Sequence, residues 1–207
     1  YTDVDGVYTA DPRVVSTARK VTHTSYDEML EMASLGAGVM HSRSIEFAKK
    51  FNVPVHVRSS QEDTTGTIIS TVSEDPTRGV SGAAVTMDEA RITLSGVPDK
   101  PGTSNAIFSA IARANITVDM IVQDAGVGGI SNISFTVPSA ELAPTLEAVQ
   151  PIAEQLGIQN ITSRDNVSKI SVVGIGMAEQ SGVSDRMFRA LSDKSINIHM
   201  ITTSQIK

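Results

Sequence analysis

The sequence contains no cysteine and no tryptophan, and only 4% of its residues are aromatic. The absence of cysteine excludes disulfides, thiol catalysis and cysteine-ligated zinc, and it is compatible with a reducing, cytoplasmic environment. Its four histidines, His23, His41, His56 and His199, stand apart from one another, without the spacing of metal ligands. We therefore expect no metal site in this chain.

Long apolar runs and basic clusters are also missing. No uninterrupted apolar stretch approaches the ~18 residues of a membrane-spanning helix, and the first residues lack the pattern of a signal peptide. The formal charge is −6, with lysine and arginine scattered along the chain, whereas a nucleic-acid footprint requires a basic patch. The composition predicts a cytoplasmic protein of one or two domains that binds neither nucleic acid nor membrane.

What the sequence does have is a half-repeated unit, over residues 91–123 and 169–203. With a two-residue gap, glycines and apolar residues of the two copies coincide, pairing Gly96 with Gly174, Gly102 with Gly182, Phe108 with Phe188, Ile111 with Leu191, Ile116 with Ile196, Met120 with Met200 and Ile121 with Ile201. Modules that cannot bury an apolar face alone pack against each other. We therefore expect a small ligand to bind in a groove between the copies.

Turn and periodicity signals organise the first part of the chain. Asp5-Gly6 is a hairpin signal, and the capping-box pair Ser25 and Glu28 begins a helix that we expect to end near Gly36. A second helix is predicted over about 42–51 and a half-buried strand over 53–59, followed by a linker to about residue 83 with one short strand at 67–70.

Alternating apolar residues become clear from residue 91 onward. They predict strands at 91–95, 116–122, 133–137 and 158–163, with helices at 103–114 and 139–156. Ser139 is the expected N-cap of the later helix, and Pro151 predicts a kink or break near Gln150. The order β-α-β-β-α-β is that of a ferredoxin-like split βαβ unit, so the predicted fold class is α+β.

The second copy supplies only β-α-β before Lys207, whereas the first copy continues to about residue 163. We therefore expect the chain to be a piece of something longer. The strand at 53–59 has no other partner, and we assign it to the sheet of the second copy, with the first copy inserted between them.

One turn carries the clearest binding chemistry. Asp99-Lys100-Pro101-Gly102 leads directly into a helix, whose free N–H groups can bind a carboxylate, while Asp99 can hold an ammonium. Together these groups describe a site for a free amino acid. On residue chemistry alone, the same turn is also typical of an ordinary helix start. The opening segment TDVDGVYTADPR is similarly open between a nucleotide contact and an acidic hairpin.

At these residues the chain resembles a known family. TDVDGVYTADPR resembles the end of the amino-acid-kinase domain of aspartate kinases, and HSRSIEFAKKFNVPVHVRSS, SGVPDKPG and NITVDMIVQ resemble the region that follows, with its two ACT modules. The resemblance implies tandem ferredoxin-like ACT modules preceded by an amino-acid-kinase tail. It divides the chain into residues 1–52 of the kinase domain, a strand and linker over 53–83, ACT module 1 over 84–164, and a truncated ACT module 2 over 165–207 plus strand 53–59.

The resemblance also implies an activity for the intact protein. Aspartate kinases phosphorylate the side-chain carboxylate of aspartate with ATP and magnesium, the first step toward lysine, threonine, methionine and, in bacteria, diaminopimelate. This piece lacks the kinase core, so we expect it to be inactive alone, to hold no catalytic residue and to bind no cofactor of its own. The residues that match nucleotide contacts of the kinase domain are Thr2, Asp3, Tyr8 and Arg13.

Effector positions carry over from the family residue by residue. The threonine-type site would consist of Asp99, Lys100, Pro101, Gly102, Ser104 and Gln123, closed by Asn197 and Ile198 of the second module. Around the lysine-type site lie Ile116, Asp119, Val183, Ser184, Ser204 and Gln205. Gln205 stands where family members often have an acid, and Ser195 replaces a common asparagine, so threonine is the firmer expectation.

The implied function is feedback inhibition by lysine, threonine or both, bound between ACT modules of a homodimer, with a separate catalytic kinase subunit as a further possible partner. An alternative from a different class is an ACT pair that only assembles a catalytic subunit and binds no effector.

Overall fold

The computed structural model describes residues 4–35, 38–74, 79–124, 126, 128–178 and 180–204. The chain folds as two compact units: unit 1 comprises Tyr1–Thr86 and Ile170–Lys207, and unit 2 comprises Met87–Lys169. Unit 2 is therefore inserted into unit 1 along the chain. No helix within the described ranges is long and apolar enough to cross a bilayer.

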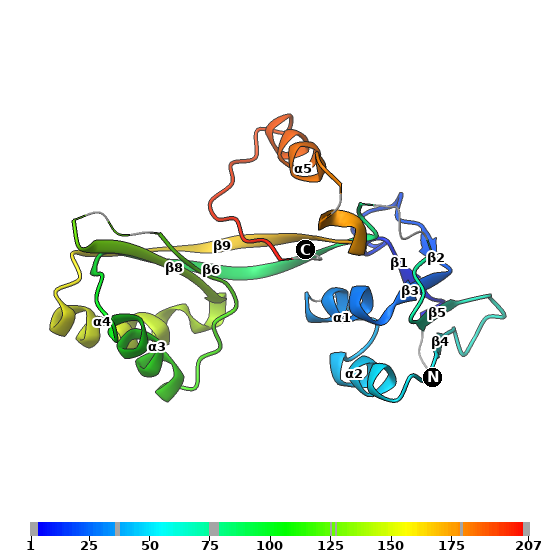
Figure 1. Cartoon of the computed structure of the whole chain (residues 1–207), viewed down its shortest axis with the longest axis horizontal. Coiled ribbons are helices and arrows are strands. Elements are labelled where there is room, and N and C mark those ends of the chain that lie inside the picture. Colours follow the sequence, from blue (N-terminus) through cyan, green and yellow to red (C-terminus); the bar gives the residue numbers. More distant parts are fainter. Residues whose placement is uncertain are drawn as a thin grey trace. The chain divides into compact units, whose positions relative to one another are not determined.

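Unit 2 has the α+β architecture that the sequence predicts. Its elements are β6 (Gly82–Pro98), α3 (Thr103–Arg113), β7 (Ile121–Gln123), β8 (Ile130–Pro138), a 3-10 turn η1 (Ser139–Glu141), α4 (Leu142–Leu156) and β9 (Asn160–Val173). The sheet order is β7-β8-β6-β9, with β8 antiparallel to both β6 and β7. Figure 1 shows α3 and α4 covering the same face of this sheet.

The core of unit 2 follows from the alternation of apolar residues. Fully buried side chains from β6 and β8 meet those of α3 and α4, namely Ile92, Leu94, Ile107, Ile111, Ile133, Phe135, Val137 and Val149. Phe135 meets the ring of Phe108 edge-on, with 5.6 Å between centroids. The opposite face of the sheet is polar, and there the hydroxyls of Thr93 and Ser134 lie 2.8 Å apart. One face of the sheet is thus an apolar core and the other is not.

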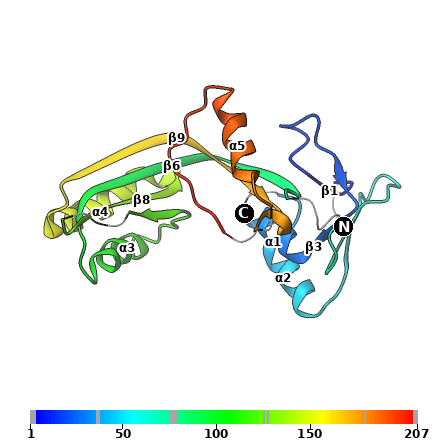
Figure 2. The same cartoon turned by 45° about the horizontal axis from the view of Figure 1, so that its top comes forward.

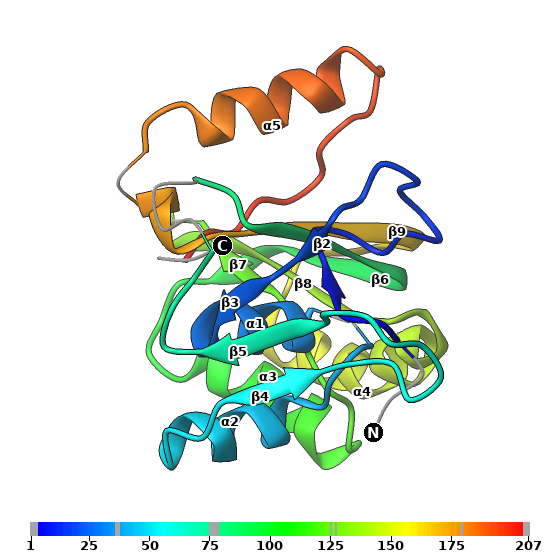
Figure 3. The ribbon, with the colours of Figure 1, turned by 90° about the vertical axis from the view of Figure 1, so that its right-hand side faces the viewer.

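Unit 1 begins with short strands and two helices. These are β1 (Val7–Tyr8), β2 (Lys20–Val21), β3 (His23–Ser25), α1 (Tyr26–Ser34), α2 (Ser42–Lys50), β4 (Val55–Val57) and β5 (Thr67–Ser70). β1 and β2 pair with each other, and a separate sheet has the order β3-β5-β4 (Figure 3). Met29, Ile45, Val57 and Ile69 are buried together between this sheet and the two helices. The last elements of unit 1 are a 3-10 turn (Ile175–Ala178) and α5 (Val183–Ser192).

The capping box of α1 is confirmed. The Ser25 hydroxyl accepts the N–H of Glu28 at 3.1 Å, and the Glu28 carboxylate accepts the N–H of Ser25 at 3.1 Å. Each side chain satisfies a backbone donor that the helix start leaves without an intrahelical partner. The predicted end of this helix at Gly36 lies outside the described residues.

The assignment of strand 53–59 to the second module is wrong. β4 pairs antiparallel with β5, Val55 opposite Ile69 and Val57 opposite Thr67. The alternating valines of β4 pack against the core that α1 and α2 cover, where Val57 is only 2% exposed. The segment that lies beside the end of β9 is instead the approach to β6, because the N–H of Ser81 donates to the carbonyl of Val173 at 2.7 Å.

Local details also differ from the prediction. Asp5-Gly6 precedes β1 and does not form the turn of the hairpin, whose connection runs from Thr9 to Arg19. α4 continues through Pro151 without a break. Burial of Thr145, Val149 and Ala153 on one side of α4 outweighs a proline penalty of about 3 kcal/mol.

The start of α4 and the second strand of unit 2 also differ from the prediction: the helix and the strand both begin later in the chain. Ser139 begins the 3-10 turn η1 and makes no side-chain cap, because α4 itself starts three residues later at Leu142. The alternating stretch that starts at Ile116 forms a strand only from Ile121. In the residues just before this strand, the N–H of Asp119 already donates to the carbonyl of Thr136.

Candidate functional site

The two repeat copies present their helices in the same way. Gly102 precedes α3 with φ 93°, and Gly182 precedes α5 with φ 89°. These left-handed conformations favour glycine, and a Cβ placed at either position would meet nothing within 4 Å. Neither helix start has a side-chain cap. Both therefore present backbone N–H groups at an open surface, which suits an anionic group.

In unit 2, the predicted binding turn lies where three elements end. The N–H of Asp99 donates to the carbonyl of Gly129 at 2.9 Å, which fixes the turn against the start of β8. The hydroxyl of Ser104, in the first turn of α3, donates to Oε1 of Gln123 at 3.2 Å, at the end of β7. Asp99, Lys100, Pro101 and Gly102 are exposed. The structure thus brings Ser104 and Gln123 together, beside a turn with an open carboxylate and an open helix start.

This arrangement has a definite chemistry. The helix start offers hydrogen-bond donors and a partial positive charge to a carboxylate. Asp99 offers a carboxylate to an ammonium, and the Ser104–Gln123 pair offers neutral polar groups. An α-amino acid carries the complementary charges, and a hydroxyl or amide side chain would complement the neutral pair.

Asp119 lies in a different environment, on the polar face of the unit 2 sheet. Asp119 lies just before β7, and β8 and β6 separate β7 from β9 in the sheet. Its carboxylate nevertheless forms an ion pair with Lys169 of β9. Glu89 of β6 is 6% exposed and interacts with both partners. Burial raises the pKa of Glu89, the nearby charge of Asp119 raises it further, and Lys169 and the Thr136 hydroxyl only partly oppose the rise.

One lysine therefore serves two carboxylates on this face. Sequence reasoning singled out Asp119 but missed Lys169 and Glu89. A signal was present, because Lys169 opens the second repeat copy, but strand alternation does not reveal which polar residues share a face across three strands. Ile116, predicted near the same site as Asp119, is buried in the core of unit 2.

Replacing Glu89 with glutamine should raise the free energy of unfolding at pH 7 by about 1 kcal/mol, by removing a buried charge that lacks a full partner. Because the folded-state pKa of Glu89 is raised, its proton stabilises the fold at low pH and that stability is lost as pH rises through the folded pKa. The gain from glutamine should therefore vanish below the unfolded pKa. Urea titrations at pH 4 and pH 7 measure this, with the exposed Glu147→Gln as control; equal stability of Glu89→Gln and wild type at pH 7 would contradict it.

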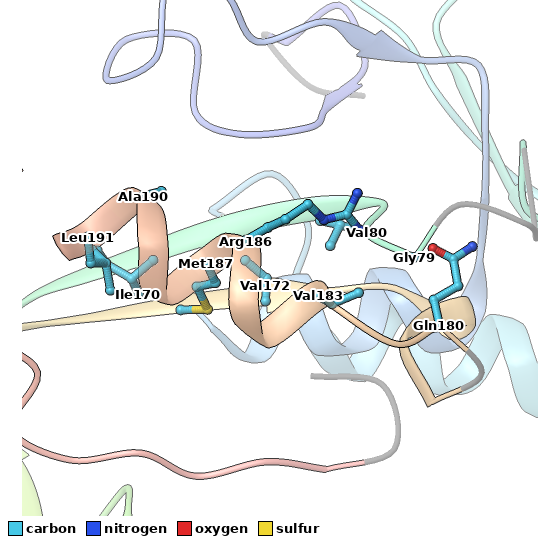
Figure 4. Close-up of a pocket in the computed structure, with 10 residues that line it drawn as sticks. All are labelled: Gly79, Val80, Ile170, Val172, Gln180, Val183, Arg186, Met187, Ala190 and Leu191. Carbon is cyan, nitrogen blue, oxygen red and sulfur yellow. The ribbon is translucent and has the colours of Figure 1, made fainter. Parts of the chain in front are cut away.

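The second module carries a groove within unit 1. The groove has a volume of about 690 Å³ and lies between α5, the approach to β6 and the end of β9 (Figure 4). Val183, Met187 and Leu191, one turn apart along α5, line it. Opposite them are Ile170 and Val172 of β9 and the residues Gly79 and Val80, with Arg186 and Gln180 as the polar lining. The groove was not predicted, although the spacing of the apolar residues on α5 indicates a buried helix face.

The predicted residues of the second module divide around this groove. Val183 is 7% exposed and lines it, whereas Ser184 is exposed on the first turn of α5. Asn197, Ile198 and Ser204 are exposed in the segment that follows α5. Gln205 lies outside the described residues. The predicted contacts of the first module belong to unit 2 and those of the second module belong to unit 1.

The predicted nucleotide contacts lie in the opening segment of unit 1. Tyr8 donates its hydroxyl to Asp5 at 3.1 Å, and Arg13 forms a two-pronged ion pair with Asp11. Thr2 and Asp3 lie outside the described residues. Tyr8 and Arg13 thus each contact an acidic neighbour in the described part of this segment. Across the described ranges, no three His, Cys, Asp or Glu side chains gather as a metal site.

Comparison with known families finds matches in two regions of the chain. Residues 1–59 match the amino acid kinase family, and residues 92–151 and 170–207 match the ACT domain. The ACT match thus joins most of unit 2 to the part of unit 1 that contains α5, and it leaves out residues 152–169.

The similar proteins of known identity are aspartokinases or their regulatory subunits. An aspartokinase of Pseudomonas aeruginosa is 45% identical over 210 residues, which are 100% of this chain and 51% of that protein. The crystal structure of the regulatory subunit of aspartate kinase from Thermus thermophilus is 36% identical, with a TM-score of 0.58, over 62% of this chain and 85% of that one. E. coli aspartokinase III, solved in complex with lysine and aspartate, is 27% identical with a TM-score of 0.74, over 99% of this chain and 45% of that one. The chain spans about half the length of the curated relatives that it matches.

Proposed function

Because this chain belongs to the aspartokinase family, we propose that it is the feedback-regulated part of an aspartate kinase, whose ACT modules bind threonine, lysine or both. The intact protein would phosphorylate the side-chain carboxylate of aspartate with ATP and magnesium in the cytoplasm, and this piece alone would be inactive. The chain's own contribution is recognition of the effector.

The observation that carries the proposal is the turn at the start of α3. The exposed carboxylate of Asp99 precedes an uncapped helix start by three residues, and the Ser104–Gln123 hydrogen bond of 3.2 Å lies beside it. The two charged ends of a free amino acid would find complementary groups there: the ammonium at Asp99 and the carboxylate at the N–H groups after Gly102. Asn197 and Ile198 of the second module would close over the side chain.

The charges on unit 2 favour threonine over lysine. Threonine's hydroxyl suits the neutral Ser104–Gln123 pair, whereas the second ammonium of lysine requires another carboxylate. Asp119 is the one carboxylate among the residues predicted around the lysine-type site, and it is already paired with Lys169. A lysine effector would therefore have to displace an internal ammonium, and Gln205 adds no charge to help it.

Binding can inhibit only if the effector favours one arrangement of the modules over another. A coupling of about 1–3 kcal/mol between effector and catalytic sites is typical of such regulation. The proposed assembly is a homodimer through ACT modules, with a separate catalytic kinase subunit as a further partner. E. coli aspartokinase III supports the lysine part of the proposal, since it was solved with lysine bound.

Calorimetric titration of the intact enzyme with each amino acid tests the proposal. We expect saturable binding of threonine and binding of lysine about tenfold weaker, because displacing Lys169 costs roughly one charged hydrogen bond. Inhibition of aspartate phosphorylation should follow occupancy. An intact dimer that releases no heat with either amino acid at millimolar concentration would instead favour an ACT pair that serves assembly alone.

A further inference from the structure

Among the described residues of unit 1, Glu28 of α1 is the most deeply buried acidic side chain, at 1% exposure. Oε2 accepts hydrogen bonds from the N–H of Ser25 at 3.1 Å and from its hydroxyl at 2.9 Å. Oε1 accepts one from the hydroxyl of Ser81, and the Ser73 side chain adds another to the carboxylate. The capping box explains the bonds to Ser25 only. It does not explain why the other oxygen reaches a residue far along the chain.

These hydrogen bonds keep the carboxylate charged. Burial raises the pKa of Glu28, but the donors from Ser81, Ser25 and Ser73 outweigh burial and hold the pKa below its ordinary value. A buried, ionised acceptor strengthens each hydrogen bond that it receives and makes the loss of any one of them costly. The position of Ser81 relative to α1 is therefore held by a strong contact.

Ser81 occupies a junction in the chain. It follows the residues matched to the amino acid kinase family and precedes those matched to the ACT domain. Its side chain binds Glu28 on α1, while its N–H donates to the carbonyl of Val173 at 2.7 Å, at the end of β9. One residue thus bonds to a helix of the kinase segment through its side chain and to a strand of the second ACT module through its backbone.

The residues just before Ser81 line the groove beneath α5. Gly79 and Val80 line the groove beneath α5, together with Val183 (Figure 4). A Cβ at Gly79 would lie 3.1 Å from Cγ2 of Val183, and a Cβ at Gly174 would lie 2.4 Å from the carbonyl oxygen of Gly79. Gly79 thus lies close to Val183 on one side and to Gly174 on the other. Because Gly79 and Val80 directly precede Ser81, a shift of the first turn of α5 can reach Ser81 through them.

We propose that the Glu28–Ser81 hydrogen bond is the coupling element through which closure of the second ACT module over the effector acts on the kinase segment, with Glu28 as a positioning residue. The inference rests on the proposed function, since it needs the segment after α5, with Asn197 and Ile198, to close over the effector. It goes beyond that function by naming where the signal crosses. Coupling requires an element with two arrangements that both sites bias. In Glu28 one oxygen is held by the α1 cap and the other by Ser81, so the bond to Ser81 can break while the cap stays formed.

The same geometry gives less support to a site that binds a cation or another small ligand. Serine donors already hydrogen-bond both oxygens of the Glu28 carboxylate, so it does not require a cation as a partner. The pocket that Glu28 and Ser81 share with Ser73 and His23 has a volume of only about 20 Å³, about the space of one water molecule. The Glu28–Ser81 contact therefore fits a role in coupling the two segments better than a role in binding a ligand.

The test uses the intact enzyme with Ser81→Ala, Ser81→Thr and Ser25→Ala. Ser81→Ala should keep the uninhibited kcat and KM within about twofold and keep effector affinity by calorimetry, while the concentration for half-maximal inhibition rises about tenfold or inhibition becomes incomplete. Ser81→Thr retains the hydroxyl and should restore wild-type inhibition. Ser25→Ala removes the hydroxyl donor to the other oxygen and the N-cap acceptor for the N–H of Glu28, and it should lower thermal stability without changing inhibition.

The outcomes separate the two proposals. If wild-type enzyme neither binds nor responds to threonine or lysine, the proposed function fails and the coupling role falls with it. If wild-type enzyme is inhibited and Ser81→Ala is inhibited at the same concentration, the proposed function stands and the coupling role of Glu28 is overturned. Loss of effector binding itself in Ser81→Ala would also overturn it, because Ser81 would then shape the site.

Discussion

Replacing Asp99 with alanine should weaken threonine binding about 100-fold and abolish inhibition at concentrations that saturate the wild-type enzyme. The reason is the charge that the change leaves behind: an effector ammonium without its carboxylate loses a charge-assisted hydrogen bond, which contributes about 2–3 kcal/mol. At 1.4 kcal/mol for each factor of ten, this corresponds to a loss of about 30- to 150-fold. The side chain of Asp99 is exposed, so the fold should be unaffected.

Calorimetry of the intact enzyme with threonine measures the change in affinity, and circular dichroism checks the fold. Asp165→Ala is the matched control, because Asp165 is an exposed carboxylate on β9 of the same unit. It removes the same charge at a position away from the α3 turn. Unchanged threonine affinity in Asp99→Ala, or an equal loss in both variants, would remove Asp99 from the site and leave long-range charge as the explanation.

The order of elements was predictable because it depends on local pattern. Strict alternation at Ile92, Leu94, Ile133 and Phe135 identified β6 and β8, and the serine–glutamate spacing identified the start of α1. These signals act over a few residues, so one sequence suffices to read them. The α+β class follows from their order alone.

Pairing between distant strands was less accessible. The strand around Val55 and Val57 could be recognised, but its partner could not, because alternation does not specify which edge a strand joins. β5 offers Ile69 to the same core, and that burial decides the pairing. The failure at Pro151 has a related cause: tertiary burial of one side of α4 outweighed a local penalty that the sequence displays plainly.

The candidate site shows the same division. Asp99, Gly102 and Ser104 are close in sequence, so a turn before a helix placed them together. Lys169 pairs with Asp119, and Ser81 with Glu28, across 50 and 53 residues. Such pairs depend on which strands and helices become neighbours. They were therefore missed, although each involves a side chain whose charge or hydroxyl was visible in the sequence.

The repeat gains a physical meaning from these contacts. Gly102 and Gly182 give α3 and α5 the same uncapped start. The copies nevertheless differ in what lies around the helix. α3 packs against α4 and the complete sheet of unit 2, whereas α5 covers a groove bounded by the approach to β6 and the end of β9. The first copy thus packs within a complete module, whereas the second faces the segment whose Ser81 bonds to Glu28 of α1.

Replacing Phe135 with alanine should have the largest effect on stability, a loss of about 3–5 kcal/mol. Phe135 is 0% exposed, lies in the middle strand pair of unit 2 and meets Phe108 at 5.6 Å. Its removal leaves a cavity between β8, α3 and α4 that the surrounding strands can only partly fill. Phe51→Ala is the control, because Phe51 is 64% exposed in unit 1, and it should cost less than about 1 kcal/mol.

Hydrogen exchange shows where the Phe135 effect acts. Because unit 2 has its own core, amides of β6 and β8 within Met87–Lys169 should exchange faster in Phe135→Ala, while amides of β3, β5 and α1 keep their protection. Threonine affinity should fall as well, since the α3 turn and Gln123 are positioned by that core. Equal acceleration in both units would mean that they unfold as one body. A change at the α3 turn could then reach the kinase segment through the fold of unit 2 as well as through Ser81.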